Sequence, residues 1–262
     1  MTVKTRLFLI LWITGLAGVL SILLIDLNAL ISILPILPGT EVPTITPTLK
    51  LITPLQPAVL VAFAVLVGVG LASSVGLSSP AAEAAARGGD AISALKPQIV
   101  PGIIGGLTGA ISLTLVAAVL KPFLSPDVVA RLGEFGKVLP PLTRLLYGGI
   151  VEELMLRWGM MTLLVWAAWR LFQKGRGDPK PACFVGAILA SSLLFAVGHL
   201  PLAFVLFPEP TFALLVFAVA ANSAFGLIGG YLYWKKGLES AMIAHGLTHV
   251  GLFAASYLGA YF

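Results

Sequence analysis

The sequence predicts an all-α membrane protein, a polytopic bundle of about seven transmembrane helices. Three observations favour this class: 58% of the 262 residues are hydrophobic, only 10% are charged, and the mean hydropathy is +1.02. A soluble domain carries about 25% charged residues. So few charges cannot cover the surface of a water-soluble globule. The composition therefore excludes a soluble enzyme, a disordered chain and a nucleic-acid-binding protein that relies on a basic face.

Several apolar runs reach the roughly 20 residues that a helix needs to cross a bilayer. The first run follows Lys4 and Arg6 as in a signal peptide. It is too long for that role and lacks a small-x-small cleavage site, so we expect it to be retained. The predicted spans are 7–27, 58–78, 99–120, 144–171, 183–206, 211–234 and 238–260.

The distribution of Lys and Arg between the loops predicts the orientation of the spans, because cytoplasmic loops are enriched in these residues. With the N-terminus inside, ten of them fall in inner loops and five in outer loops, and Arg157 is left inside a span. We therefore expect a multi-pass protein with a cytoplasmic N-terminus and, for seven spans, an outer C-terminus. An eighth span or a re-entrant segment is the alternative, and it would move the C-terminus.

Three connections between the spans have distinct compositions. Residues 31–57 hold six prolines, which predicts extended backbone and no regular helix. Ser125-Pro126-Asp127 is a helix-start signal, and it predicts a short helix on the membrane surface within 121–142. Residues 79–97 are predicted to be a linker. We divide the chain into N-terminal membrane helices with surface loops, 1–142, and a catalytic core, 143–262.

The ionisable residues inside the predicted spans are the candidates for function. A charged side chain near the middle of a bilayer costs about 2.5–3.5 kcal/mol on insertion scales, so such residues are rare unless they are used. The chain's three histidines all fall in apolar segments. The candidates are Glu152, Glu153, Arg157, His199, His245 and His249.

The acidic pair in the fourth span predicts a catalytic carboxylate. Glu153 and Arg157 stand four residues apart, so on a helix they can form an ion pair. Glu152 points about 100° away and finds no partner on its own helix. A carboxylate placed in this way is suited to act as a general base or acid. The alternative is that the cluster only holds helices together.

The histidines predict proton transfer, a metal site or an oxyanion site. His199, between Gly198 and Pro201, is placed to orient Glu152 or share a proton with it. A hydrogen bond from His199 to a backbone carbonyl is the alternative. His245 and His249 share one helix face, a spacing that a metal ion or a bound oxyanion can exploit.

Three separated motifs in apolar helices mark one family: Glu-Glu-x-x-x-Arg, Phe-x-x-x-His and His-x-x-x-Asn. The chain resembles the CAAX-protease and bacteriocin-processing family, also called the Abi family, of intramembrane glutamic endopeptidases. The resemblance covers about residues 140–260. The residues that carry it are Glu152, Glu153, Arg157, Phe195, His199 and His245.

The resemblance implies a role for each matching residue. Glu152 would activate the attacking water with assistance from His199, and Glu153 and Arg157 would fix the geometry. His245 and the residue four positions later would stabilise the oxyanion of the tetrahedral intermediate. The last position departs from the family pattern, because His249 stands where the family has Asn. A neutral histidine still offers one N–H donor for that role.

These observations predict an intramembrane glutamic-type endopeptidase that hydrolyses a peptide bond without a cofactor. Its expected partners are the lipid bilayer and a peptide or protein substrate, either prenylated or a leader peptide, and not nucleic acid. One alternative is a zinc-dependent peptidase in which His199, His245 and His249, with Glu152, form the metal site. Another is a proton-coupled transporter. The candidates converge in one half of a chain without internal repeats, which favours an enzyme over a transporter.

Overall fold

The computed structural model describes residues 1–35, 44–259 and 261, and in this part of the chain every regular element is helical. The first half contains α1 (Val3–Leu20), η1 (Ser21–Leu24), α2 (Leu27–Ser32), α3 (Pro47–Ile52), α4 (Leu55–Leu71), η2 (Ala72–Val75), α5 (Pro80–Ala86), α6 (Ala91–Leu120), η3 (Lys121–Phe123) and α7 (Pro126–Val138). The second half contains α8 (Pro141–Thr143), η4 (Arg144–Glu152), η5 (Leu154–Met161), α9 (Thr162–Gln173), α10 (Pro181–Gly198), α11 (Leu200–Leu206), α12 (Phe212–Lys235) and α13 (Leu238–Tyr257). The prediction of an all-α bundle is confirmed.

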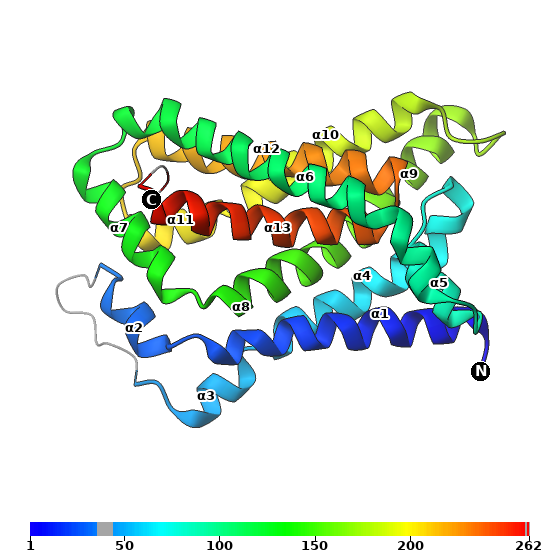
Figure 1. Ribbon diagram of the computed structural model, residues 1–262, viewed down its shortest axis with the longest axis horizontal. Helices are drawn as coiled ribbons and strands as arrows, with labels where there is room; N and C mark the ends of the chain where they lie inside the picture. The colour runs from blue at the N-terminus through cyan, green and yellow to red at the C-terminus, as the bar shows by residue number, and fades with distance from the viewer. Residues whose placement is uncertain (36–43, 260, 262) are drawn as a thin grey trace.

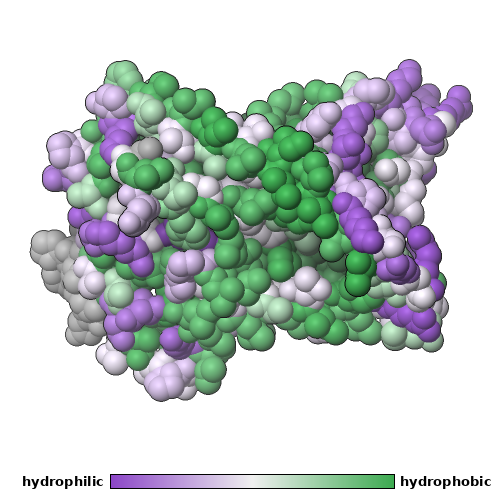
Figure 2. Space-filling view, in the orientation of Figure 1, coloured by the Kyte–Doolittle hydropathy of each residue, from purple (hydrophilic) through white to green (hydrophobic). Residues whose placement is uncertain are grey.

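The surface of the bundle is that of an integral membrane protein. Among the described residues, five helical stretches are long and apolar enough to cross a bilayer, and they coincide with five of the predicted spans. Large hydrophobic side chains such as Phe63, Leu107 and Leu189 are exposed on these helices. Figure 2 shows apolar residues across the middle of the molecule and polar residues gathered mainly at its two ends. The five stretches are Val3–Leu24, Pro47–Val75, Ala91–Phe123, Pro181–Leu206 and Phe212–Lys235.

The remaining two predicted spans, 144–171 and 238–260, are helical but are not among these five stretches. They are the spans that carry the two glutamates, Arg157 and two of the histidines, which lower their hydropathy. The first part of span 144–171 is not a regular α-helix either, because η4 and η5 are π-helical, whereas α9 continues the span as an α-helix. π-Helical turns are rare and often occur at functional sites.

Helix α13 lies inside the bundle, between α6 and η4, while α1 and α4 pack on the other side of η4 and η5 (Figure 1). The small residues of α6 allow this close approach. A Cβ atom added to Gly102 would lie 2.7 Å from the Cβ atom of Ile243 on α13, and one added to Gly106 would collide with Leu247. The α6 glycines thus allow close packing against α13, and this packing fixes the helix that carries His245 and His249.

The structure corrects two of the predicted connections. In 31–57, α3 forms despite the prolines, because Pro47 takes the first helical position and the Thr46 side chain caps the helix by accepting from the Leu49 N–H at 3.1 Å. Residues 36–43 of that stretch lie outside the described residues. The predicted linker 79–97 holds α5 and the first turns of α6.

The predicted short helix after the third span is confirmed as α7. Its N-cap is Ser125, whose hydroxyl accepts from the Val128 N–H at 3.4 Å. Two arginines tether the helix across one end of the bundle: Arg131 donates to the Leu206 carbonyl at 3.1 Å, and Arg144 donates to the Gly136 carbonyl. This end also holds the C-terminus, whereas the N-terminus lies at the opposite end (Figure 1). The cellular side of each end stays a prediction.

Candidate active site

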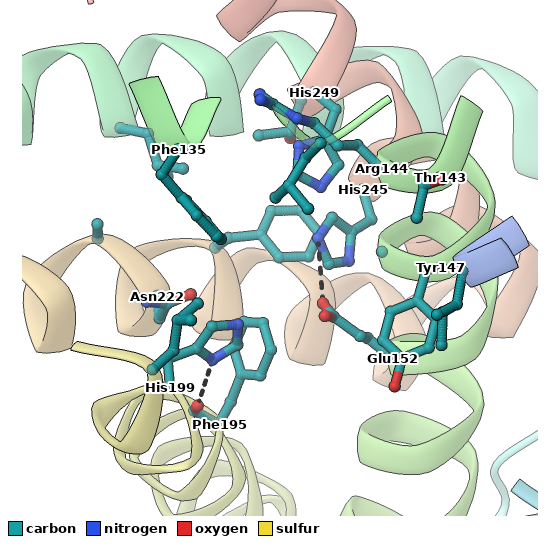
Figure 3. A pocket seen from close by; sticks show the side chains of 18 of the residues that line it. Phe135, Thr143, Arg144, Tyr147, Glu152, Phe195, His199, Asn222, His245 and His249 are labelled. Atoms are coloured by element: carbon teal, nitrogen blue, oxygen red, sulfur yellow. Dashed lines mark hydrogen bonds and ion pairs between the residues drawn. The ribbon is translucent and has the colours of Figure 1, made fainter. Parts of the chain in front are cut away.

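A cavity of about 420 Å³ lies between α7, α10, α12, α13 and the start of η4. Most of its wall is apolar, with Phe135, Phe195 and Phe225 among the lining side chains. Glu152, His199, His245 and His249 all line it as well (Figure 3). The fold therefore brings these four candidate residues to one cavity.

The predicted ion pair between Glu153 and Arg157 is present beneath this cavity. Nε of Arg157 lies 3.2 Å from Oε2 of Glu153, and the two side chains are 1% and 0% exposed. Nη2 of Arg157 also donates to the Gly226 carbonyl on α12 at 3.2 Å. The guanidinium lies 5.6 Å from the centre of the Phe225 ring. The ion pair lies within one helical segment, and the contacts of Arg157 with Gly226 and Phe225 are the ones that join η5 to α12.

His245 lies between the two glutamates. Its Nδ1 atom is 2.8 Å from Oε1 of Glu153, and its Nε2 atom is 3.7 Å from Oε2 of Glu152. Glu153 is paired with Arg157 and is therefore an ionised carboxylate, which can only accept hydrogen bonds. Nδ1 of His245 must then be the donor, so Nε2 is the atom presented to Glu152. The sequence pattern did not predict this contact between Glu153 and His245.

Glu152 is placed differently from Glu153, although the two are adjacent. Its side chain is 17% exposed and faces the cavity, whereas Glu153 is enclosed by protein. Among the described residues, His245 is the one ionisable nitrogen-bearing side chain within 4 Å of the Glu152 carboxylate. One carboxylate of the pair is thus neutralised and fixed, and the other remains accessible to a ligand.

His199 does not pair with Glu152. Its Nδ1 atom donates to the Phe195 carbonyl at 2.9 Å, and its ring packs edge-on against Phe195 with centroids 4.6 Å apart. Helix α10 ends at Gly198. The Phe195 carbonyl is therefore one of the last four carbonyl groups of the helix, which have no hydrogen-bond partner within it. The backbone-carbonyl alternative is therefore the correct one. A carbonyl can only accept, so Nε2 of His199 is left as an acceptor at the cavity wall.

His249 stacks on His245, with ring centroids 5.1 Å apart and planes inclined by 18°. Both rings lie against Gly148 of η4. A Cβ atom added to Gly148 would lie 2.6 Å from Nε2 of His249 and 3.3 Å from Nε2 of His245. The absence of a side chain at this position makes room for the two imidazoles.

The lining residues that were not predicted include Arg144, Tyr147, Gly148 and Phe225. The first three lie eight, five and four residues before Glu152, so the helical repeat before Glu152 was the signal that could have found them. Arg144 was instead counted among the five basic residues of the outer loops, because it stands at the very start of the predicted span 144–171. Asn222 also lines the cavity, although its side-chain amide donates to the Ala218 carbonyl on its own helix.

Among the residues described, no group of three or more His, Cys, Asp or Glu side chains is arranged to hold a metal ion. His199 and His245 each commit Nδ1 to another acceptor, which leaves only their Nε2 atoms as ligands. The choice between a metal-free site and a zinc site stays a prediction for experiment.

Comparison with known proteins finds one family similar to this part of the chain. No curated protein and no solved structure matches the chain. Residues 135–251 match the family model described as "Type II CAAX prenyl endopeptidase Rce1-like". This segment contains both glutamates, Arg157 and all three histidines. This part of the chain is therefore similar to the Rce1-like family, in agreement with the resemblance carried by the three motifs.

Proposed function

We propose that this protein is a glutamate-dependent intramembrane endopeptidase, in which Glu152 activates the water that attacks a peptide bond. One observation carries the proposal. The Glu152 carboxylate faces an apolar cavity next to a second carboxylate, Glu153, which is already committed to Arg157 and His245. Only Glu152 is free to accept a proton from a substrate water.

The geometry around Glu152 leaves space for that water. The 3.7 Å between Oε2 of Glu152 and Nε2 of His245 is longer than a direct hydrogen bond. A water molecule held by both atoms would satisfy each of them. In the proposed step Glu152 takes a proton from the water while the water oxygen forms a bond to the scissile carbonyl carbon. The same proton passes to the amine nitrogen when the C–N bond breaks.

The proposed oxyanion site is the face formed by the two stacked imidazoles. His249 packs against His245 and has no hydrogen bond to a carboxylate among the described residues, so one of its ring nitrogens can donate to the carbonyl oxygen as that oxygen becomes negative. His199, which offers Nε2 as an acceptor at the same cavity, is the proposed second acceptor for the water or the leaving amine.

The family supports a peptide or protein substrate for this chain. We propose that the substrate carries an apolar modification, because a second cavity of about 310 Å³ shares nine lining residues with the first. Leu132, Phe207, Leu214 and Phe217 line this extension. A CAAX sequence is a C-terminal motif whose cysteine is prenylated, so a prenylated C-terminal peptide is the first substrate to test.

The test is Glu152→Gln, which keeps the shape of the side chain and removes the base. We expect cleavage of a fluorogenic farnesylated CAAX-type peptide by the purified protein to fall at least about 100-fold. Glu134→Gln is the matched control, because Glu134 is exposed on α7, pairs with Lys137 and does not line the cavity. Wild-type turnover by Glu152→Gln would overturn the proposed function, and proton flux without cleavage would favour a transporter.

A further inference from the structure

Arg144 is the one lysine or arginine among the described residues that line the two cavities, and it lines both of them. Both cavities are otherwise largely apolar, and they share Phe135 and His249 beside Arg144. Figure 3 shows Arg144 next to His249, on the side of His245 away from Glu152. A positive charge thus stands at the junction between the candidate catalytic groups and the apolar extension.

The contacts of Arg144 leave part of its guanidinium unused. Nη2 donates to the Gly136 carbonyl, the group lies 4.9 Å from the centre of the Phe253 ring, and the buried Nε has no hydrogen-bond partner. No carboxylate of the residues 1–35, 44–259 and 261 lies within ion-pair distance of it. Among these described residues the guanidinium has no carboxylate partner, and a charge without a partner is costly in an apolar surrounding. A guanidinium with free N–H groups binds a carboxylate strongly, through charge-assisted hydrogen bonds.

We propose that Arg144 binds the C-terminal carboxylate of the peptide substrate and so positions the scissile bond at Glu152. This inference rests on the proposed function and adds a recognition residue to it. Arg144 precedes Glu152 by eight residues on a continuous helix, which separates the two by no more than about 12 Å along the axis at about 1.5 Å per residue. An extended peptide covers about 3.3–3.6 Å per residue. About three residues between the cleaved bond and the carboxylate therefore match the separation.

A purely structural role is the rival explanation, because Arg144 tethers α7 through Gly136. Arg131 provides the matched comparison. It also tethers α7, through the Leu206 carbonyl, and its guanidinium lies 5.7 Å from the Phe207 ring. It lines neither of the two cavities. The two arginines therefore share the tethering role, and they differ in their access to a substrate.

The experiment measures binding of two fluorescent peptides to the Glu152→Gln protein in one detergent. Both peptides have a farnesylated cysteine followed by three aliphatic residues, and one ends in a free acid whereas the other ends in an amide. We expect the acid to bind at least about tenfold more tightly than the amide. Arg144→Gln should abolish this preference, Arg144→Lys should retain part of it, and Arg131→Gln should leave it intact.

Equal binding of the two peptides would overturn the proposal, and so would a preference that survives in Arg144→Gln or an acid peptide that does not bind. If Arg144→Gln does not fold, the acid-to-amide ratio of the parent protein and of Arg144→Lys still decides the matter. The proposed function is tested by a different measurement, the turnover of the Glu152→Gln protein. Its failure is therefore distinguishable from a failure of peptide binding. The preference for the acid is a readout that loss of the α7 tether alone would not change.

Discussion

Nδ1 of His245 lies 2.8 Å from Oε1 of Glu153, although the two residues are 92 positions apart in the chain. This bond joins α13 to the junction of η4 and η5 and fixes which nitrogen of the imidazole faces Glu152. The same carboxylate holds Arg157 through its other oxygen. Glu153 is thus the residue that connects the buried positive charge with the orientation of the candidate catalytic histidine.

Glu153→Gln should destabilise the protein more than Glu152→Gln does. The amide keeps the shape of Glu153 but leaves the Arg157 guanidinium buried without a counter-charge, and breaking a buried pair costs about 3–5 kcal/mol. Glu152 has no such partner on its own helix, so its amide variant should unfold close to the wild-type midpoint. Thermal unfolding of the purified variants in detergent measures the difference, with Glu134→Gln as the surface-pair control. Equal midpoints for Glu152→Gln and Glu153→Gln would contradict this account of the pair.

Gly148→Ala should reduce the cleavage rate without unfolding the protein. The new methyl group would lie 2.6 Å from Nε2 of His249 and push both imidazoles out of position. Alanine also favours a helix over glycine by about 1 kcal/mol, which offsets part of any loss of stability. Gly246→Ala is the control, because an added Cβ there meets only Leu145, at 4.0 Å. A Gly148→Ala protein that cleaves at the wild-type rate would show that the imidazoles have room to move.

The sequence predicted the fold class and the members of the site because both depend on composition and local spacing. A charged residue in an apolar helix is conspicuous in the sequence, and the four-residue interval of Glu153 and Arg157 predicts their ion pair directly. The shape of the cavity wall was not predictable in this way. Arg144 looks like a loop charge in the sequence, and only the packing of α7 against η4 places it inside the cavity.

The hydrogen-bond partner of His199 and the helix α5 show what local patterns in the sequence do not contain. His199 was expected near Glu152, but the end of α10 supplies an unsatisfied carbonyl much closer to it. The segment of α5 was predicted to be a linker, yet Glu239 accepts from the N–H groups of Ala81 and Ala82 at 2.9 and 3.1 Å. That cap comes from a residue more than 150 positions away, so no local pattern contains it.

His249→Asn should retain a substantial part of the cleavage activity. Asparagine offers an N–H donor at the position where the family has this residue, and it is smaller than histidine, so it fits beside Gly148 without displacing His245. The same substitution at His245 provides the contrast, because it removes the bond to Glu153 and the nitrogen that faces Glu152. The measurement is the initial rate of cleavage of a saturating peptide by each of the two variants. Loss of activity in His249→Asn as complete as in His245→Asn would argue against a simple donor role for His249.

The metal content of the active protein decides between the glutamate-dependent mechanism and the zinc-dependent alternative. We expect turnover to be insensitive to a chelator and to proceed without stoichiometric zinc, because Arg157 places a positive charge beside the site and Glu153 and His245 already satisfy each other. A zinc site would need His199, His245 and His249 to turn their remaining nitrogens toward one point, together with Glu152. His249→Asn should also leave the metal content unchanged if the histidine is only a donor. One bound zinc per protein, with activity lost to a chelator and restored by zinc, would establish the metal-dependent mechanism instead.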